Sequence, residues 1–148
     1  ASPSDPAGRL NAGRRARRKV QPMPSGIGIT TMRALLEDLD QRPGDVTLIY
    51  RTSCDQDRIL TGELSALAKR HQARFFVVSG QRASHRQSWL PQHAAHLGDV
   101  EALLQFAPDV AKHDVFICGS PGWMTAAEQA VIGAGVPREH VHIERFTY

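Results

Sequence analysis

Short apolar runs alternate with stretches of helical periodicity along most of the chain. The apolar runs are rich in β-branched and aromatic residues, which is typical of strands buried on both faces. Between them, apolar residues recur every three or four positions, which predicts amphipathic helices. The predicted strands are 45–51, 73–80, 113–119 and 141–146, and the predicted helices are 30–39, 57–71, 100–108 and 121–135.

This alternation predicts an α/β fold with helices on both faces of a parallel sheet. We expect a Rossmann-like, doubly wound sheet of about five strands in one domain over residues 20–148. The first strand is predicted to be defective, because Pro22 and Pro24 have no N–H to donate to a ladder. Either the sequence was altered locally there, or the first strand is lost and the sheet is weakened at its centre.

The charges divide the chain into a basic arm and a mildly acidic remainder. Residues 9–19 hold six cations and no anion, within a chain of 18 basic and 15 acidic residues. We interpret residues 1–19 as a basic linker or the remnant of a preceding domain. Such an arm can also bind nucleic acid or another acidic partner. No aromatic residue lies among its arginines, so we do not expect nucleic acid as the partner.

Several functional classes find no support in the sequence. No apolar run approaches the roughly 18 residues of a membrane helix. The two cysteines, Cys54 and Cys118, form no CxxC pair, and the simplest expectation is a cytoplasmic protein, or one at the cytoplasmic face of a membrane. The seven histidines lack metal-ligand spacing, so we expect no metal site. There is no GxSxG elbow and no Walker lysine, which argues against a hydrolase.

Glycine turns and arginines follow the predicted strands. Because ligands bind outside the carboxyl ends of the strands in open α/β sheets, these residues mark the expected site. Glycine lets a diphosphate approach the main chain, and a helix N-terminus offers N–H groups and partial positive charge. The set suits a dinucleotide. The expected cofactor-binding residues are Gly26, Gly28, Thr30, Arg51, Thr52, Arg82, Gly119, Pro121 and Gly122.

The expected cofactor is either NADP(H) or NAD(H). NAD-preferring Rossmann domains typically hold the ribose 2′-hydroxyl with an acidic residue, but here the second strand ends in Arg51. An arginine would tolerate a 2′-phosphate and could favour it. The loop from Gly26 to Gly28 lacks the third glycine of the GxGxxG fingerprint, so by itself it is equally consistent with a structural turn.

Three motifs, GIGIT, CGSPGWM and the terminal HIERFTY, occur in this order. Together they resemble the pyridine-nucleotide domain of the ferredoxin–NADP reductase family, and most of all its bacterial ferric-reductase-like and NADPH-oxidase-like flavoproteins. The family patterns run roughly GGxGITP, CGPPGMM and a terminal ERF. The resemblance extends from Lys19 to the end of the chain. It departs from the family at Ser25, Thr31 and Ser120.

The resemblance implies roles for the expected binding residues. Gly26, Gly28 and Thr30 would lie against the diphosphate and the nicotinamide side of the cofactor. Arg51 and Arg82 would approach the adenosine phosphate end. Taken singly, either arginine could instead be an ordinary surface residue.

It also implies a candidate catalytic set of Cys118, Glu144 and Phe146. Cys118 and Gly119 would sit beside the nicotinamide, near the carbon that yields hydride. Glu144 matches the terminal acid of the family, and Phe146 would cover the flavin ring until nicotinamide displaces it. Without the resemblance, Phe146 would be interpreted as an edge-strand aromatic residue. Tyr148 is a weaker candidate for the same position.

The implied enzyme is an NAD(P)H-dependent flavin oxidoreductase. Hydride would pass from NAD(P)H to FAD, and electrons would pass on to haem, iron, an iron–sulfur protein or a quinone. The sequence shows neither the arginine–aromatic–serine motif nor the glycine-rich motif of the family's flavin domain. We therefore expect FAD to be held by an upstream domain of the parent protein, and this chain alone to be inactive. The alternative is a non-catalytic nucleotide-fold domain whose basic arm binds an acidic partner.

Overall fold

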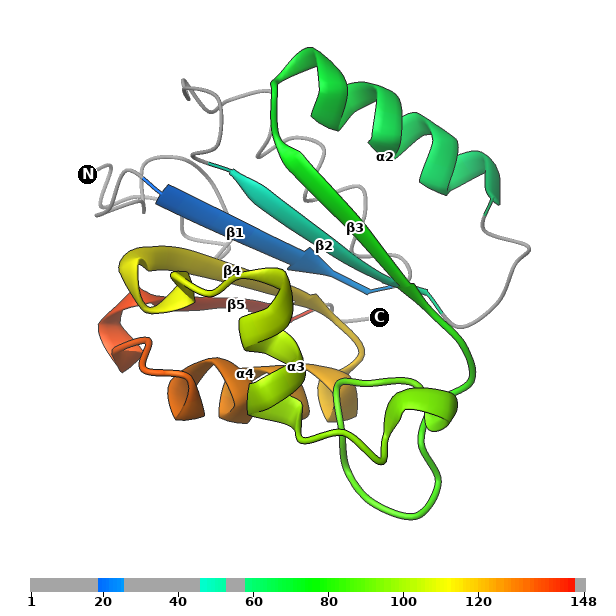
Figure 1. Cartoon of the computed structure of the whole chain (residues 1–148), viewed down its shortest axis with the longest axis vertical. Helices are drawn as coiled ribbons and strands as arrows, with labels where there is room; N and C mark the ends of the chain where they lie inside the picture. Colours follow the sequence, from blue (N-terminus) through cyan, green and yellow to red (C-terminus); the bar gives the residue numbers. More distant parts are fainter. Residues whose placement is uncertain (1–18, 26–45, 53–57, 146–148) are drawn as a thin grey trace.

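The computed structural model describes residues 19–25, 46–52 and 58–145, which form parallel strands covered by helices (Figure 1). The predicted alternation is confirmed throughout this part, whereas the predicted helix over 30–39 lies outside it. Three short 3₁₀ turns complete the connections: η4 (Gln92–Ala94), η5 (Val110–Lys112) and η6 (Arg138–His140). The strands and helices are β1 (Lys19–Pro24), β2 (Thr47–Thr52), α2 (Arg58–Arg70), β3 (Arg74–Ser79), α3 (Asp99–Phe106), β4 (His113–Gly119), α4 (Pro121–Gly133) and β5 (Val141–Arg145).

The strands lie in the order β3-β2-β1-β4-β5. One parallel ladder joins β2 to β3, and another joins β1, β4 and β5. The two ladders meet at β1 and β2 through two isolated bridges, Val20–Val46 and Ser25–Arg51. Figure 1 shows β1 between β2 and β4. This is the order of the first five strands of a Rossmann sheet, 3-2-1-4-5, with β1 at its centre.

The first strand is present, which corrects the suggestion that it is lost. β1 pairs with β4 along its whole length, from Lys19 to Pro24. Lys19 is the first residue of this strand. Its ammonium group lies 2.7 Å from the Asp109 carboxylate, which anchors the beginning of β1 beside β4.

The defect of β1 is confined to the edge that faces β2. Ser25 donates its main-chain N–H to Cys118 O at 2.7 Å, so odd-numbered residues of β1 direct their main-chain groups toward β4. Even-numbered residues direct theirs toward β2. Pro22 and Pro24 are both even-numbered, so both missing donors fall on the β2 side. The β1–β4 ladder is therefore intact, and the boundary between β1 and β2, which we term the proline seam, keeps only its end bridges.

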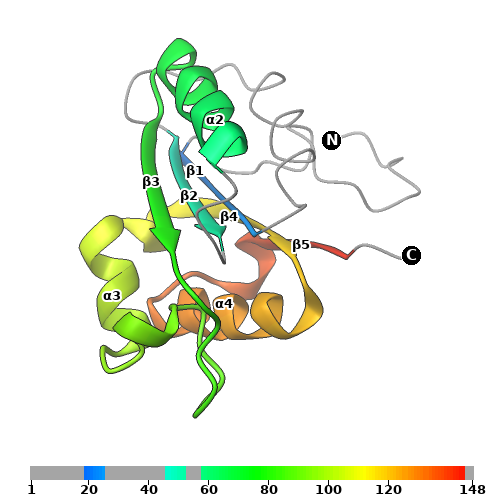
Figure 2. The ribbon, with the colours of Figure 1, turned by 90° about the vertical axis from the view of Figure 1, so that its right-hand side faces the viewer.

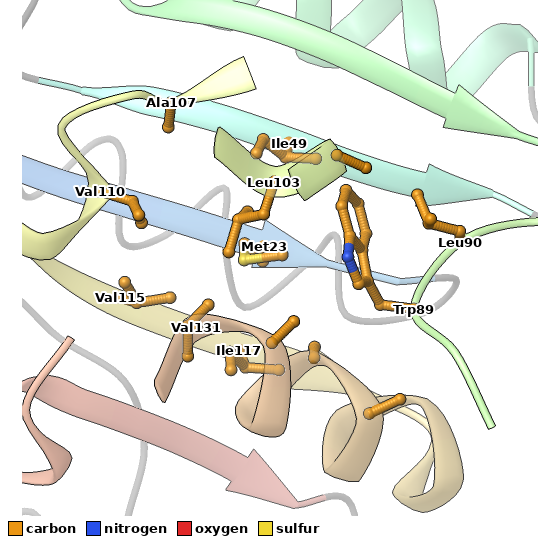
Figure 3. Packing of buried hydrophobic residues seen from close by; sticks show 14 of the residues in the cluster. Met23, Ile49, Trp89, Leu90, Leu103, Ala107, Val110, Val115, Ile117 and Val131 are labelled. Atoms are coloured by element: carbon orange, nitrogen blue, oxygen red, sulfur yellow. The ribbon is translucent and has the colours of Figure 1, made fainter. Parts of the chain in front are cut away.

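The larger apolar core lies between the sheet and the helices α3 and α4 (Figure 3). Met23, Ile49 and Ile117 come from three different strands and pack with Leu103 of α3 and Val131 of α4; all five are fully buried. Burial of each such side chain contributes about 1.5–3 kcal/mol to folding. Figure 3 also shows Trp89 near the carboxyl ends of β1 and β2, where it closes this core.

The helix α2 covers the opposite face of the sheet, as Figure 2 shows. Its Leu64 and Leu67 pack in one cluster with Leu48 and Tyr50 of β2. Because Ile49 points to the other core, β2 is buried on both faces, which explains its uninterrupted apolar run. None of the helices that the structure describes has the length and apolar content needed to cross a bilayer.

Candidate functional site

The carboxyl ends of β1 and β4 approach each other closely. A Cβ atom added at Gly119 would lie 2.7 Å from Ser25 Cβ and 3.2 Å from Ser25 O, so only glycine permits this contact. Ser25 also forms a bridge with Arg51 at the end of β2. Three strand ends therefore converge at the edge of the sheet where a Rossmann fold binds its ligand.

The helix α4 begins at this edge with its N-terminus open. Ser120 occupies the N-cap position without making a side-chain capping bond, and Pro121 is the first helical residue. The first-turn amides of Gly122 and Trp123 have no acceptor within the helix, since an α-helix leaves its first N–H groups unpaired. Ser120 and Pro121 are exposed. The helix start thus offers N–H donors and partial positive charge at an accessible surface.

Arg82 overhangs the start of α4. A Cβ atom added at Gly122 would collide with the Arg82 guanidinium, so the cation lies directly over this glycine. Arg82 is exposed, and no carboxylate in the described part of the chain lies within ion-pair distance of it. A cation next to a helix N-terminus is electrostatically unfavourable, because both carry positive charge. An anion bound between them would remove this repulsion.

Arg51, near the end of β2, has a different environment from Arg82. It is only 4% exposed. Its Nη1 donates to the main-chain carbonyls of Thr52 and Gly80, the latter at 2.9 Å, its Nε donates to Trp89 O at 3.2 Å, and its Nη2 lies 3.5 Å from Gln81 O. Burial lowers the pKa of the guanidinium, but arginine stays protonated in proteins. Its donors point into the protein.

The structure brings six of the predicted binding residues to one edge of the sheet. Among them, Arg82 and Pro121 are exposed, whereas Arg51 and Thr52 are buried. The six residues are Arg51, Thr52, Arg82, Gly119, Pro121 and Gly122. The remaining predicted binding residues, Gly26, Gly28 and Thr30, lie outside the described residues.

The candidate catalytic residues are only partly described. Cys118 is the next-to-last residue of β4 and is fully buried. Glu144 lies directly opposite it in the β4–β5 register, so the two are level on neighbouring strands. The side chain of Glu144 and all of Phe146 lie outside what the structure describes.

Sequence reasoning missed how the segment after β3 is built. Gly80 has φ +139°, and a Cβ atom there would lie 2.8 Å from both Pro91 and His93, so only glycine fits. Trp89 O accepts from Arg51 Nε and from Trp123 Nε1, the latter at 3.1 Å. The available signal was a glycine after a strand, followed by a tryptophan and a proline in an otherwise polar stretch.

The chemistry available at this edge is anion binding. Helix amides, an exposed guanidinium and close-packed glycines suit phosphate groups. In the described residues, no group of three or more His, Cys, Asp or Glu is placed to hold a metal ion.

Comparisons with known sequences identify the family of the chain. The family model described as the oxidoreductase NAD-binding domain matches residues 24–129. The ferredoxin reductase component of 3-ketosteroid-9-alpha-monooxygenase from Mycolicibacterium smegmatis is 36% identical over 123 residues, which are 82% of this chain and 32% of that protein. Ferredoxin–NADP reductase B from Sorangium cellulosum is 29% identical over 130 residues, covering 82% of this chain and 52% of the relative.

Solved structures share the fold. The flavohem-like FAD/NAD-binding domain of nitric oxide dioxygenase from Vibrio cholerae has a TM-score of 0.67 at 22% identity, covering 87% of this chain and 51% of that one. The ferredoxin–NADP+ reductase of Neisseria gonorrhoeae, solved with FAD and NADP, has a TM-score of 0.54 at 17% identity, covering 95% and 58%. The chain spans about a third of the length of the steroid-monooxygenase reductase components it matches. It belongs to the NAD-binding domain family of ferredoxin–NADP reductase-like oxidoreductases.

Proposed function

We propose that this chain binds NADPH or NADH and presents the nicotinamide to FAD held by a separate domain of a larger flavoprotein. The observation that carries the proposal is the exposed Arg82 guanidinium over the open N-terminus of α4. This arrangement stands at the ligand edge of a Rossmann-type sheet and calls for an anion. The names of the relatives, which include ferredoxin reductases, support a redox nucleotide as that anion.

The protein's part in the reaction is to bind and orient. The nicotinamide would supply a hydride and the flavin would accept it. The amides of Gly122 and Trp123, together with Arg82, would hold phosphate oxygens. Gly119 would keep the strand ends close enough to form one continuous surface.

The remaining roles follow the family resemblance. Gly26, Gly28 and Thr30 would hold the diphosphate from the β1 side. Cys118 and Glu144, which are level on β4 and β5, would flank the nicotinamide.

The acceptor side of the reaction lies in the parent protein. Phe146 would shield the flavin ring when no nicotinamide is present. Relatives that are reductase components of oxygenases, and a nitric oxide dioxygenase domain of similar fold, support haem or an iron–sulfur protein as the next electron carrier. We propose a location in the cytoplasm, or at the cytoplasmic face of a membrane if the parent protein is anchored there.

The test is a calorimetric titration of the chain with NADPH and NADH, before and after Arg82→Ala. If Arg82 contacts the 2′-phosphate, the substitution should weaken NADPH about tenfold more than NADH, because a charge-assisted hydrogen bond contributes about 1.5–3 kcal/mol. Arg138→Ala is the matched control: Arg138 is another exposed arginine, and it lies in η6, before the amino end of β5 and therefore away from the carboxyl ends of the strands.

Each result has a distinct meaning. An equal loss for both nucleotides would place Arg82 at the diphosphate that they share, and would contradict its role at the 2′-phosphate. An unchanged affinity for both would overturn the anion site at α4. If the unsubstituted chain bound neither nucleotide, the proposed function itself would be refuted.

A further inference from the structure

Arg51 connects three segments that are distant in the sequence. Its acceptors are the carbonyl of Thr52 on its own strand, those of Gly80 and Gln81 just after β3, and that of Trp89 before α3. The guanidinium thus lies at the centre of a ring of main-chain oxygens. Only arginine has a planar fork of five donors that can serve such a ring while remaining charged.

The carbonyls held by Arg51 belong to the turn that carries Arg82. Gln81 O also accepts from the main-chain N–H of Gln92 at 2.7 Å, and Arg82 itself forms an antiparallel bridge with Pro91. Gly80 reaches its positive φ under the Pro91 and His93 side chains. With the main chain fixed on both sides of Arg82, the direction in which its side chain leaves the turn is set.

The same guanidinium is tied to the start of α4. Trp89 O receives Arg51 Nε at 3.2 Å and Trp123 Nε1 at 3.1 Å, so one oxygen joins the end of β2 to the first turn of the helix. Arg51 therefore holds both sides of the anion site: the turn that presents Arg82, and the helix start over which Arg82 lies.

We propose that Arg51 is a positioning residue of the nucleotide site, which acts through Arg82 and does not itself contact the cofactor. This inference rests on the proposed nucleotide binding and names the residue that organises it. Four of the five guanidinium N–H groups of Arg51 are directed at main-chain carbonyls, and the side chain is only 4% exposed, so it offers little to a phosphate.

The test is a double-mutant cycle on the whole chain, with NADP+ as the titrant and calorimetry as the readout. Arg51→Lys keeps the charge but cannot reproduce the fork, and it should weaken NADP+ about tenfold, as small misplacements of binding groups do. In an Arg82→Ala background the same substitution should change the affinity less than about twofold, because its effect passes through Arg82. Arg138→Lys, at an exposed position in η6 before the amino end of β5, should leave the affinity unchanged in both backgrounds.

Thermal melts of every variant separate positioning from general loss of stability. Should Arg51→Lys fail to fold, Trp123→Phe removes the other donor to Trp89 O and should show the same dependence on Arg82. Losses that add across the two positions would overturn the inference, because they would mean that Arg51 binds the cofactor directly or acts only on stability. If the unsubstituted chain did not bind NADP+ or NADH, the proposed function would fall and this inference with it.

Discussion

At the scale of single residues, His113 is the clearest case of a titratable group placed by the fold. It begins β4 fully buried, its Nδ1 lies 3.0 Å from Asp109 O, and its Nε2 has no partner within the structure described. Burial lowers the pKa of the imidazole, an effect that the nearby Asp109 charge opposes and that Lys19 and Arg74 reinforce. The folded chain therefore favours neutral His113.

The lowered pKa of His113 predicts how the stability of the folded chain changes with pH. Below about pH 6.5 the unfolded chain binds a proton at this position that the folded chain resists, so stability should fall as the pH drops through that region. His113→Gln should flatten the decrease in melting temperature between about pH 7.5 and about pH 5.5. The comparison is the slope of the variant against the slope of the original chain.

Other groups titrate in both proteins, so the difference in slope isolates His113. The matched control is His96→Gln at an exposed position, which should leave the slope unchanged. A slope that persists in His113→Gln would contradict the assignment.

The sequence could predict the chemistry of individual residues but not their direction. The sequence does not distinguish Arg51 from Arg82, because each stands at the end of an apolar strand and each could contact a phosphate. The turn at Gly80 and the loop to Trp89 decide that one is buried and the other exposed. Those contacts join residues far apart in sequence, and no local pattern encodes them.

At the scale of elements, the prolines of β1 show the same limit. The predicted strand 113–119 agrees with β4, because an apolar run and a glycine suffice to define it. For β1, the sequence showed that two donors were missing. It could not show that both were missing from the same edge, because that depends on which strands become neighbours.

The register makes this asymmetry testable with two neighbouring substitutions. If the register of the Val20–Val46 bridge is continued, Pro22→Val directs an N–H toward Thr47 O across the seam. A hydrogen bond there would contribute about 1 kcal/mol, and the greater entropy of the unfolded chain without the proline would cost about 0.5 kcal/mol. The melting temperature should rise by about 1–2 °C. Gln21→Pro removes a donor on the intact β4 side and should lower the melting temperature by about 3–10 °C, since it leaves a buried carbonyl unpaired.

The informative quantity is the sign of each change, measured by calorimetry on both variants. If Pro22→Val is destabilising, the Thr47 carbonyl is not within reach of the new donor. If Gln21→Pro is tolerated, the intact ladder contributes less than its register indicates.

At the scale of the whole molecule, the alternation of strands and helices was enough to predict the α/β class, and with it the edge of the sheet where a nucleotide site is expected. We expect this chain to be one working part of a larger enzyme. Purified alone, it should bind NADPH, show no flavin absorbance and fail to transfer electrons from NADPH to ferricyanide, because the flavin that would accept hydride is proposed to lie elsewhere. A yellow preparation that NADPH bleaches would show that this chain holds its own flavin.

The proline seam also bears on how the molecule opens. In the described part of the chain, two isolated bridges and side-chain packing join the unit of β2, β3 and α2 to the unit of β1, β4, β5, α3 and α4. We expect such a division to give two cooperative unfolding units, the smaller of which opens at a lower free energy than the whole. Arg51 spans the open end of the seam, from β2 to the loop that packs on α4. A nucleotide bound across the same end would contact both units. The free energy of local opening should therefore increase as the nucleotide concentration is raised.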